Sequence, residues 1–188
     1  MQPQNKKIKD FNKLGRLFKA GTVFTAFDSE TTTCTPTTGR IIELGAVKFN
    51  CNGEISRYEC LFNPDQEISP FIQNLTHITN KMVIDAPKIE SKLPEFLDFI
   101  KDSVLIAHNA QFDINFLTAE IEKAKFINPR NRFIDTLQLS RWAYPEFEHH
   151  NLLYLAQTLE INPGHSHRAL DDAITCMELF KKIINYID

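Results

Sequence analysis

"FTAFDSETTT", residues 24–33, is the stretch that decides the fold. Its first part is rich in β-branched and aromatic residues, so it predicts a strand over 22–28. Asp28 and Glu30 follow at the end of this strand and share one face, because residues two apart on a strand point the same way. A lone buried carboxylate is costly. A pair of them indicates either a shared proton or a bound divalent cation.

The rest of the chain predicts one α/β domain with a mixed sheet. Two further strands, over 40–50 and 55–63, are joined by a short turn and predict an antiparallel hairpin. The apolar run 104–107 predicts a central buried strand. A loop with a short helix is expected over 69–89, and a short strand that runs into a helix over 132–144. Further helices are expected at 90–102, 111–125, 150–161 and 168–188.

The composition is that of an ordinary globular protein, and 188 residues favour one domain. We expect a basic N-terminal segment at 1–20 and a single domain at 21–188. The segment carries a charge of +5 and the remainder −8. It either touches nucleic acid or another anionic partner, or is a solvated tail that leads into a short helix.

Neither a membrane nor a secretory pathway is expected for this chain. No apolar run is long enough to span a bilayer, and no apolar stretch follows the first lysines. The four cysteines show no CxxC spacing, which is typical of free thiols in a reduced compartment. We therefore expect a cytoplasmic location.

A second acidic stretch is "LIAHNAQFD", residues 105–113. It begins as a buried strand and places Asp113 on the first turn of the next helix, where the helix dipole favours an aspartate even without a function. His108 and Asn109 are either site residues or simply capping and turn residues. Phe112 is either a core residue or a ring that stacks on a base.

The third acidic stretch is "GHSHRALDDA", residues 164–173. His167 and Asp172 are five residues apart, so on one helix they would point in different directions. They approach one centre only if His167 lies in the loop before the helix. At this point His165 competes with His167, and Asp171 competes with Asp172.

Taken together, the three stretches indicate two-metal hydrolysis of a phosphodiester. Two Mg²⁺ ions about 4 Å apart clamp the attacking and leaving oxygens in such sites. Mg²⁺ prefers oxygen ligands, and carboxylates also supply the negative charge that holds two dications. A neutral imidazole can then take the proton from the attacking water.

The motifs "FDSETT…RIIELGAVKF", "LIAHNAQFDINFL" and "HRALDDA" resemble those of the DEDDh 3'→5' exonucleases. This superfamily contains the epsilon proofreading subunit of bacterial DNA polymerase III. The resemblance covers roughly residues 22–187, because it continues in "LTHITNKMVIDAP" and "FIDTLQLSR". It implies a ribonuclease H-like fold, with a five-stranded mixed sheet flanked by helices and an antiparallel second strand.

The resemblance also implies roles for single residues. Two Mg²⁺ or Mn²⁺ ions would be held by Asp28, Glu30, Asp113 and Asp172. Asp28 would bridge the ions, Glu30 and Asp172 would complete the nucleophile-side site, and Asp113 would hold the second ion largely through water. His167 would be the general base.

Four substrate-binding residues are implied as well: Thr31, Leu75, Thr76 and Phe112. Thr31 would offer its backbone near the 3'-terminal nucleotide. Leu75 and Thr76 would lie against the terminal base or sugar, and Phe112 would pack against the penultimate nucleotide. The sequence departs from the family at Thr33 and His77, where glycine is usual. A threonine in a left-handed turn would be strained, and His77 would change the rim of the pocket.

By resemblance, the substrate is the 3' end of single-stranded or frayed DNA, in the manner of a proofreading enzyme. The alternatives are a 3'→5' exoribonuclease that trims RNA ends and a non-catalytic nucleic-acid-binding module. A DNA polymerase catalytic subunit is a further expected partner. The epsilon subunit is tethered by an additional C-terminal segment, and this chain ends after its last predicted helix. We therefore expect one of three alternatives for this chain: it is part of a longer protein, it works alone, or it docks through its basic N-terminal segment.

Overall fold

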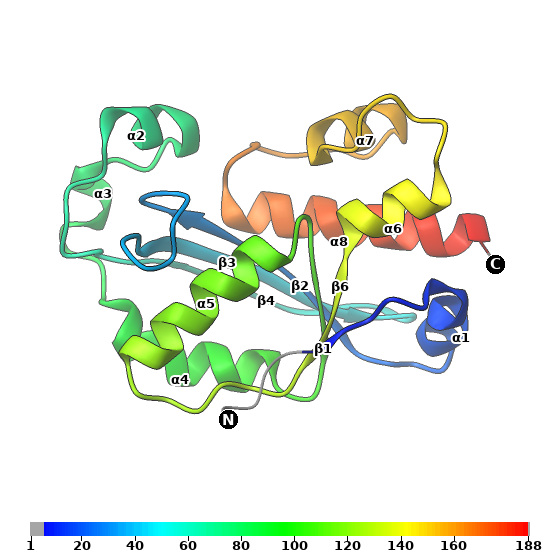
Figure 1. Ribbon diagram of the computed structural model, residues 1–188, viewed down its shortest axis with the longest axis horizontal. Helices are drawn as coiled ribbons and strands as arrows, with labels where there is room; N and C mark the ends of the chain where they lie inside the picture. The colour runs from blue at the N-terminus through cyan, green and yellow to red at the C-terminus, as the bar shows by residue number, and fades with distance from the viewer. Residues whose placement is uncertain (1–5, 188) are drawn as a thin grey trace.

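The computed structural model describes residues 6–187 and is built around a six-stranded mixed sheet (Figure 1). The order across the sheet is β1-β6-β5-β2-β3-β4. β3 runs antiparallel to both of its neighbours, and all other neighbouring strands are parallel. The strands are β1 (Lys6–Lys7), β2 (Phe24–Thr31), β3 (Ile41–Asn50), β4 (Gly53–Leu61), β5 (Val104–Ala107) and β6 (Arg132–Asp135). The predicted α/β fold with a mixed sheet is confirmed.

Strand β1 makes the sheet one strand wider than the five strands expected. Its two residues are both lysines, so it carries no apolar alternation that could have predicted it. It is held through the backbone instead: the Lys6 N–H donates to the Asn131 carbonyl (3.1 Å), and the Ile8 N–H to the Phe133 carbonyl (2.7 Å). The short helix expected in this segment is present as α1 (Leu14–Lys19).

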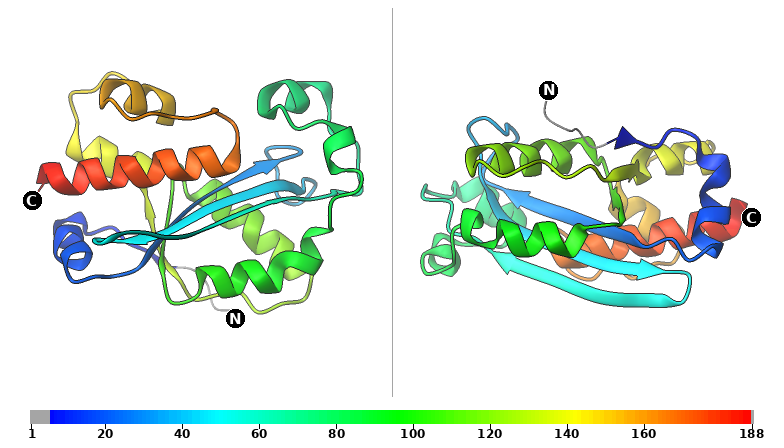
Figure 2. Two further views of the ribbon diagram at one scale, coloured as in Figure 1. Left: turned by 180° about the vertical axis from the view of Figure 1, so that it is seen from behind. Right: turned by 90° about the horizontal axis from the view of Figure 1, so that it is seen from below.

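The other helices cover both faces of the sheet. They are α2 (Pro70–Thr76), α3 (Asn80–Val83), α4 (Ile89–Ile100), α5 (Gln111–Lys123), α6 (Thr136–Ala143), α7 (Leu152–Thr158) and α8 (Ala169–Ile187). In Figure 2, α8 (red) and α4 (green) lie on opposite sides of the strands. One apolar cluster joins α1, α6, α7 and α8 to one face, and a second joins α4 and α5 to the other. Within residues 6–187, none of the helices is long and apolar enough to cross a membrane.

Strand β2 alternates between these two cores. Phe24 and Ala26 belong to the cluster under α8, and Phe27 to the cluster under α4 and α5. Asp28 and Glu30 continue the series of Phe24 and Ala26, so they are on the α8 side of the sheet. The alternation therefore decides which helix the two carboxylates face.

Helix α8 lies against strand β3 at Gly45, the residue that pairs with Asp28 on β2. A Cβ atom added to Gly45 would overlap the backbone of Ala169 and Leu170 at the start of α8. Backbone atoms cannot rotate away as a side chain can. The absence of a side chain at Gly45 therefore sets how closely α8 approaches the two carboxylates.

We predict that Gly45→Ala destabilises the fold by about 3 kcal/mol or more, because the added methyl forces α8 away from β3. Urea unfolding checks this. Gly21→Ala is the control: its φ is +78°, but its Cβ would meet nothing within 4 Å, so backbone strain alone should cost about 1 kcal/mol. A loss at Gly45 no larger than the loss at Gly21 would contradict the packing.

Candidate active site

Asp28 and Glu30 lie at the carboxyl end of β2, where open α/β sheets form their ligand crevices. Across the ladder to β3, Asp28 pairs with Gly45 and Glu30 with Glu43. Glu30 is 9% exposed, and Asp28 is partly exposed. The two carboxylates therefore sit beside the start of α8.

Asp113 comes from the first turn of α5 and is 3% exposed. Its Oδ1 accepts hydrogen bonds from the backbone N–H (3.0 Å) and the hydroxyl (2.7 Å) of Ser29. Ser29 lies between Asp28 and Glu30 in β2. These two bonds thus fix the third carboxylate against the end of the strand that carries the first two.

The loop before α8 supplies His167, and the helix supplies Asp172. The His167 N–H donates to Asp172 Oδ2 (2.9 Å), and its backbone is left-handed, with a φ of 62°. The competing pair makes its own contact, because the His165 N–H donates to Asp171 Oδ2 (2.7 Å). Only His167 and Asp172 of the four line the hollow that the other carboxylates share.

All five predicted catalytic residues meet in this hollow, which has a volume of about 220 Å³. Ligand atoms of Glu30, His167 and Asp172 lie within 4.8 Å of one another. The remaining lining residues are Ser29, His108, Asn109, Phe112 and Leu152. Helices α2 and α7 stand on either side of this end of the sheet (Figure 1).

Burial raises the pKa of every carboxyl in the cluster, and repulsion by the other cluster members adds to this for Asp28 and Glu30. Burial, followed by the charges of Asp113 and Glu30, raises the pKa of Asp28 well above its usual value. Burial and then Asp172 raise the pKa of Glu30 to about 8. The pKa of Asp113 rises to about 7, and that of Asp172 is also raised, in both cases mainly by burial.

The donor set fits Mg²⁺ or Mn²⁺. Four carboxylates offer the hard oxygen ligands that these ions prefer. The charges that act most strongly on Asp28 are all negative. Arg168 lowers the pKa of Glu30, but its guanidinium already binds another glutamate, Glu43. Bound dications would supply the positive charge that the cluster lacks.

Glu43 anchors the start of α8 beside this cluster. It is fully buried and accepts hydrogen bonds from Arg168 Nη2 (2.6 Å), Arg168 Nε (3.1 Å) and the Ala169 N–H (2.9 Å). Arg168 directly follows His167, so the anchor also fixes the chain that presents the imidazole. We did not predict Glu43 or Arg168. The sequence feature that could have identified Glu43 is its place as a charged residue inside the apolar strand "IIELGAV".

The four predicted substrate-binding residues are placed differently from one another. Phe112 lines the hollow. Leu75 is 39% exposed on α2. The buried hydroxyls of Thr31 and Thr76 are engaged locally, because they donate to the carbonyls of Thr33 (2.7 Å) and Ile72 (2.9 Å). Of the four, Phe112 lines the hollow with the carboxylates, and the backbone of Thr31 directly follows Glu30 at the end of β2.

The two departures from the family pattern have different outcomes. Thr33 is not among the residues with positive φ, and its hydroxyl accepts a hydrogen bond from the Thr35 N–H (3.1 Å). The strain that a left-handed threonine would cause therefore does not arise. His77 does occupy a left-handed position, with a φ of 59°, where it ends helix α2. Histidine is among the residues that tolerate this region better than most.

His108 and Asn109 form one wall of the hollow and act as its supports. His108 Nε2 lies 2.8 Å from the His150 carbonyl oxygen, and Nδ1 lies 3.0 Å from Thr136 Oγ1. Burial lowers the pKa of His108 to about 4, so its ring is neutral and donates to the carbonyl. The Asn109 N–H donates to Asp135 Oδ1 (3.1 Å). By contrast, the side chain of His167 is exposed.

These raised pKa values predict how the metal-free protein responds to pH. The folded state holds protons more tightly than the unfolded chain, so this contribution to stability is fully present below about pH 4 and is lost as the pH rises to about 8. Asp28→Asn removes one repelling charge. In EDTA it should therefore melt at a higher temperature than the wild type near pH 8, with the gap closing near pH 5. A gap of equal size at both pH values would contradict the clustering.

Comparison with known proteins identifies the family of this site. Residues 25–180 match the family model of RNase T, described as an exonuclease. The chain is 42% identical over 161 residues to a PolC-type DNA polymerase III of Caldanaerobacter subterraneus subsp. tengcongensis. The match covers 86% of this chain and 11% of that protein. It is 40% identical over 165 residues to the DNA polymerase III epsilon subunit of Treponema pallidum, which covers 86% of this chain and 76% of that subunit.

Solved structures agree in fold. Exonuclease X in complex with 5'-overhanging duplex DNA is 28% identical, with a TM-score of 0.70 over 86% of this chain and 91% of that chain. The nuclease domain of 3'hExo bound to rAMP, described as a DEDDh family member, matches with a TM-score of 0.77 over 88% of this chain and 92% of that chain, at 19% identity. The chain therefore belongs to the RNase T family of exonucleases, which are hydrolases.

Proposed function

We propose that this protein is a metal-dependent 3'→5' exonuclease that hydrolyses phosphodiester bonds at the 3' end of single-stranded or frayed DNA. The observation that carries this proposal is the convergence of Asp28, Glu30, Asp113, His167 and Asp172 in one hollow. The DNA polymerase III relatives support DNA as the substrate. An RNA substrate remains the second reading, since selection depends on room for a 2'-hydroxyl at the 3' end.

The proposed mechanism assigns each polar side chain one task. Asp28, Glu30, Asp113 and Asp172 would hold two Mg²⁺ or Mn²⁺ ions. When bound, these ions supply the charge that stabilises the attacking and leaving oxygens. His167 accepts the proton of the attacking water, for which its exposed position beside Asp172 is suited. Phe112 packs against the substrate near the scissile bond, and Leu75 on α2 contacts the terminal base as it enters.

Partnership with a polymerase is also proposed on the basis of the relatives. This chain spans about a tenth of the PolC-type proteins and three quarters of the epsilon subunit. In the PolC-type relatives, the matching region is therefore one part of a much larger replication enzyme. We propose that residues 21–188 act as a single exonuclease domain that either accompanies such a polymerase or acts on free 3' ends.

The test is hydrolysis of 5'-labelled single-stranded DNA and of RNA of the same sequence, each with Mg²⁺, Mn²⁺ or EDTA. We predict a ladder that shortens from the 3' end and requires metal. His167→Ala should reduce the rate by roughly 10²- to 10⁴-fold, because the water loses its general base.

The matched control is His165→Ala, which removes a histidine of the same loop that is 91% exposed and does not line the hollow. Its rate should stay near that of the wild type. Normal hydrolysis by His167→Ala would refute the site, and cleavage within the strand would refute the exonuclease. The ratio of the DNA and RNA rates decides between the two substrates.

A further inference from the structure

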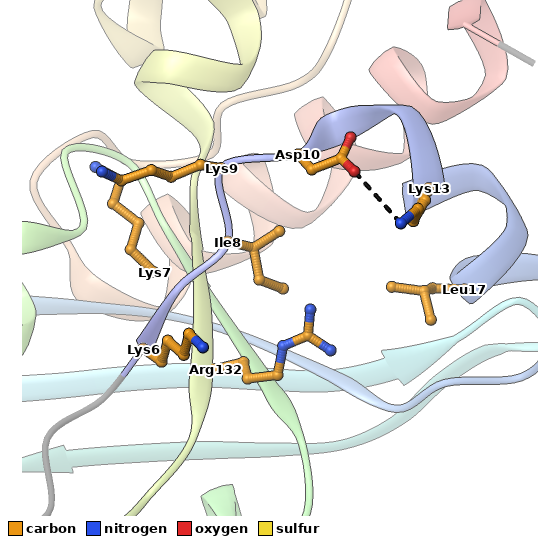
Figure 3. Close-up of a pocket in the computed structure, with 8 residues that line it drawn as sticks. All are labelled: Lys6, Lys7, Ile8, Lys9, Asp10, Lys13, Leu17 and Arg132. Atoms are coloured by element: carbon orange, nitrogen blue, oxygen red, sulfur yellow. Dashed lines mark ion pairs between the residues drawn. The ribbon is translucent and has the colours of Figure 1, made fainter.

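A basic groove lies at the edge of the sheet where β1 meets β6. Of its lining residues, only Arg132 falls within residues 25–180, the part that matches the family model. The volume of the groove is about 430 Å³. Figure 3 shows the side chains of Lys6 and Arg132 side by side at one end, and the Asp10–Lys13 ion pair at the other. Ile8 lies between them and Leu17 lies near Lys13, and both contribute apolar surface (Figure 3). The groove thus combines cationic rims with an apolar centre.

The segment that builds the groove is fixed to the domain. The backbone bonds of β1 hold it to β6. Ile8, Phe11 and Leu14 are buried in the core under α8. Lys7 Nζ pairs with Asp135 Oδ2 (3.0 Å). The backbone of this segment is therefore held by neighbours on both sides. Lys6 lies beside Arg132, while the side chain of Lys9 extends toward that of Lys7 (Figure 3).

Most of the positive charge at the groove is unneutralised. Lys13 pairs with Asp10 (3.6 Å). Lys6, Lys9 and Arg132 are exposed and have no carboxylate partner among residues 6–187. Residues 1–5 contain no acidic side chain that could provide one. These three unpaired cations, on a chain of net charge −3, are available to bind an anionic ligand.

The groove is also close to the candidate active site. Strand β6 begins at Arg132 beside the groove and ends at Asp135, roughly 10 Å further at about 3.3 Å per residue. Asp135 accepts the N–H of Asn109, a residue that lines the hollow. A nucleic-acid strand whose 3' end lies among the carboxylates needs only a few nucleotides to reach the groove.

We propose that this groove binds the sugar-phosphate backbone of the substrate strand, a few nucleotides upstream of its 3' end. Arg132 offers a planar guanidinium that suits phosphate oxygens, and Lys6 and Lys9 add point charges. Contacts of this kind position a strand without reading its sequence. The groove therefore increases affinity for long substrates, while the acidic hollow holds the terminus. This inference rests on the proposed function, because it takes nucleic acid as the substrate.

The test is fluorescence anisotropy with labelled DNA strands of about 3 and about 20 nucleotides. It uses the His167→Ala background with Mg²⁺, so that the strand is bound but not consumed. The triple variant Lys6→Gln/Lys9→Gln/Arg132→Gln should bind the longer strand roughly tenfold more weakly at low salt. The slope of log K against log salt should become less negative by about 2, because each lost phosphate contact contributes about 0.7 to the slope for single strands. Binding of the short strand is the internal reference.

A control variant removes the same charge at the opposite part of the molecule, on and near β4 and α4: Arg57→Gln/Lys88→Gln/Lys92→Gln. It should keep the wild-type preference for the long strand. Equal weakening in both triple variants would show a net-charge effect and overturn the proposal, as would an unchanged affinity for the long strand. Polyglutamate serves as a second probe. If the Lys6→Gln/Lys9→Gln/Arg132→Gln variant lost binding to polyglutamate but kept binding to DNA, the groove would be assigned to an acidic protein instead. Failure of the hydrolysis test would refute the proposed function separately, because this assay measures binding alone.

Discussion

The packing of helix α8 against strand β3 is the contact on which the site depends. At Gly45 the helix backbone occupies the space where a side chain would stand. Two residues away on the same strand, Glu43 binds Arg168 and the first N–H of the helix. Both residues pair with the carboxylate residues of β2. The same contact thus closes the core and brings Asp172 and His167 over Asp28 and Glu30.

The cluster shows how two neighbouring acidic groups can have opposite roles. Glu43 is fully buried, but an arginine and a helix N–H satisfy it, so it stabilises the fold. Glu30 lies directly across the ladder, and burial together with three other carboxylates raises its pKa. The guanidinium of Arg168 binds the structural glutamate, Glu43. The four carboxylates of the hollow are left with a deficit of positive charge that suits them to bind dications.

Much of this arrangement could be predicted from the sequence. The strands around Phe24 and Leu105 and the long helix from Ala169 follow from apolar patterns, and the five catalytic candidates follow from their places at the ends of these elements. Strand β1 could not be predicted, because Lys6 and Lys7 pair only through their backbones. The anchor of Glu43 and the bond of Lys7 to Asp135 join residues that are 125 and 128 positions apart, and no local pattern reveals such pairs. The residues alone left His165 and His167 as alternatives, the family resemblance selected His167, and His167 is the one that lines the hollow.

The central claim is that the four carboxylates gather to hold two divalent cations, and calorimetric titration with Mn²⁺ tests it most directly. The account predicts two ions per chain for the wild type and at most one for Asp28→Asn, because the substitution removes one of the four carboxylates that would hold them. Asp171→Asn, which changes the neighbouring aspartate outside the hollow, should still bind two. A wild type that binds no Mn²⁺, or an Asp28→Asn variant that binds as the wild type does, would contradict the account.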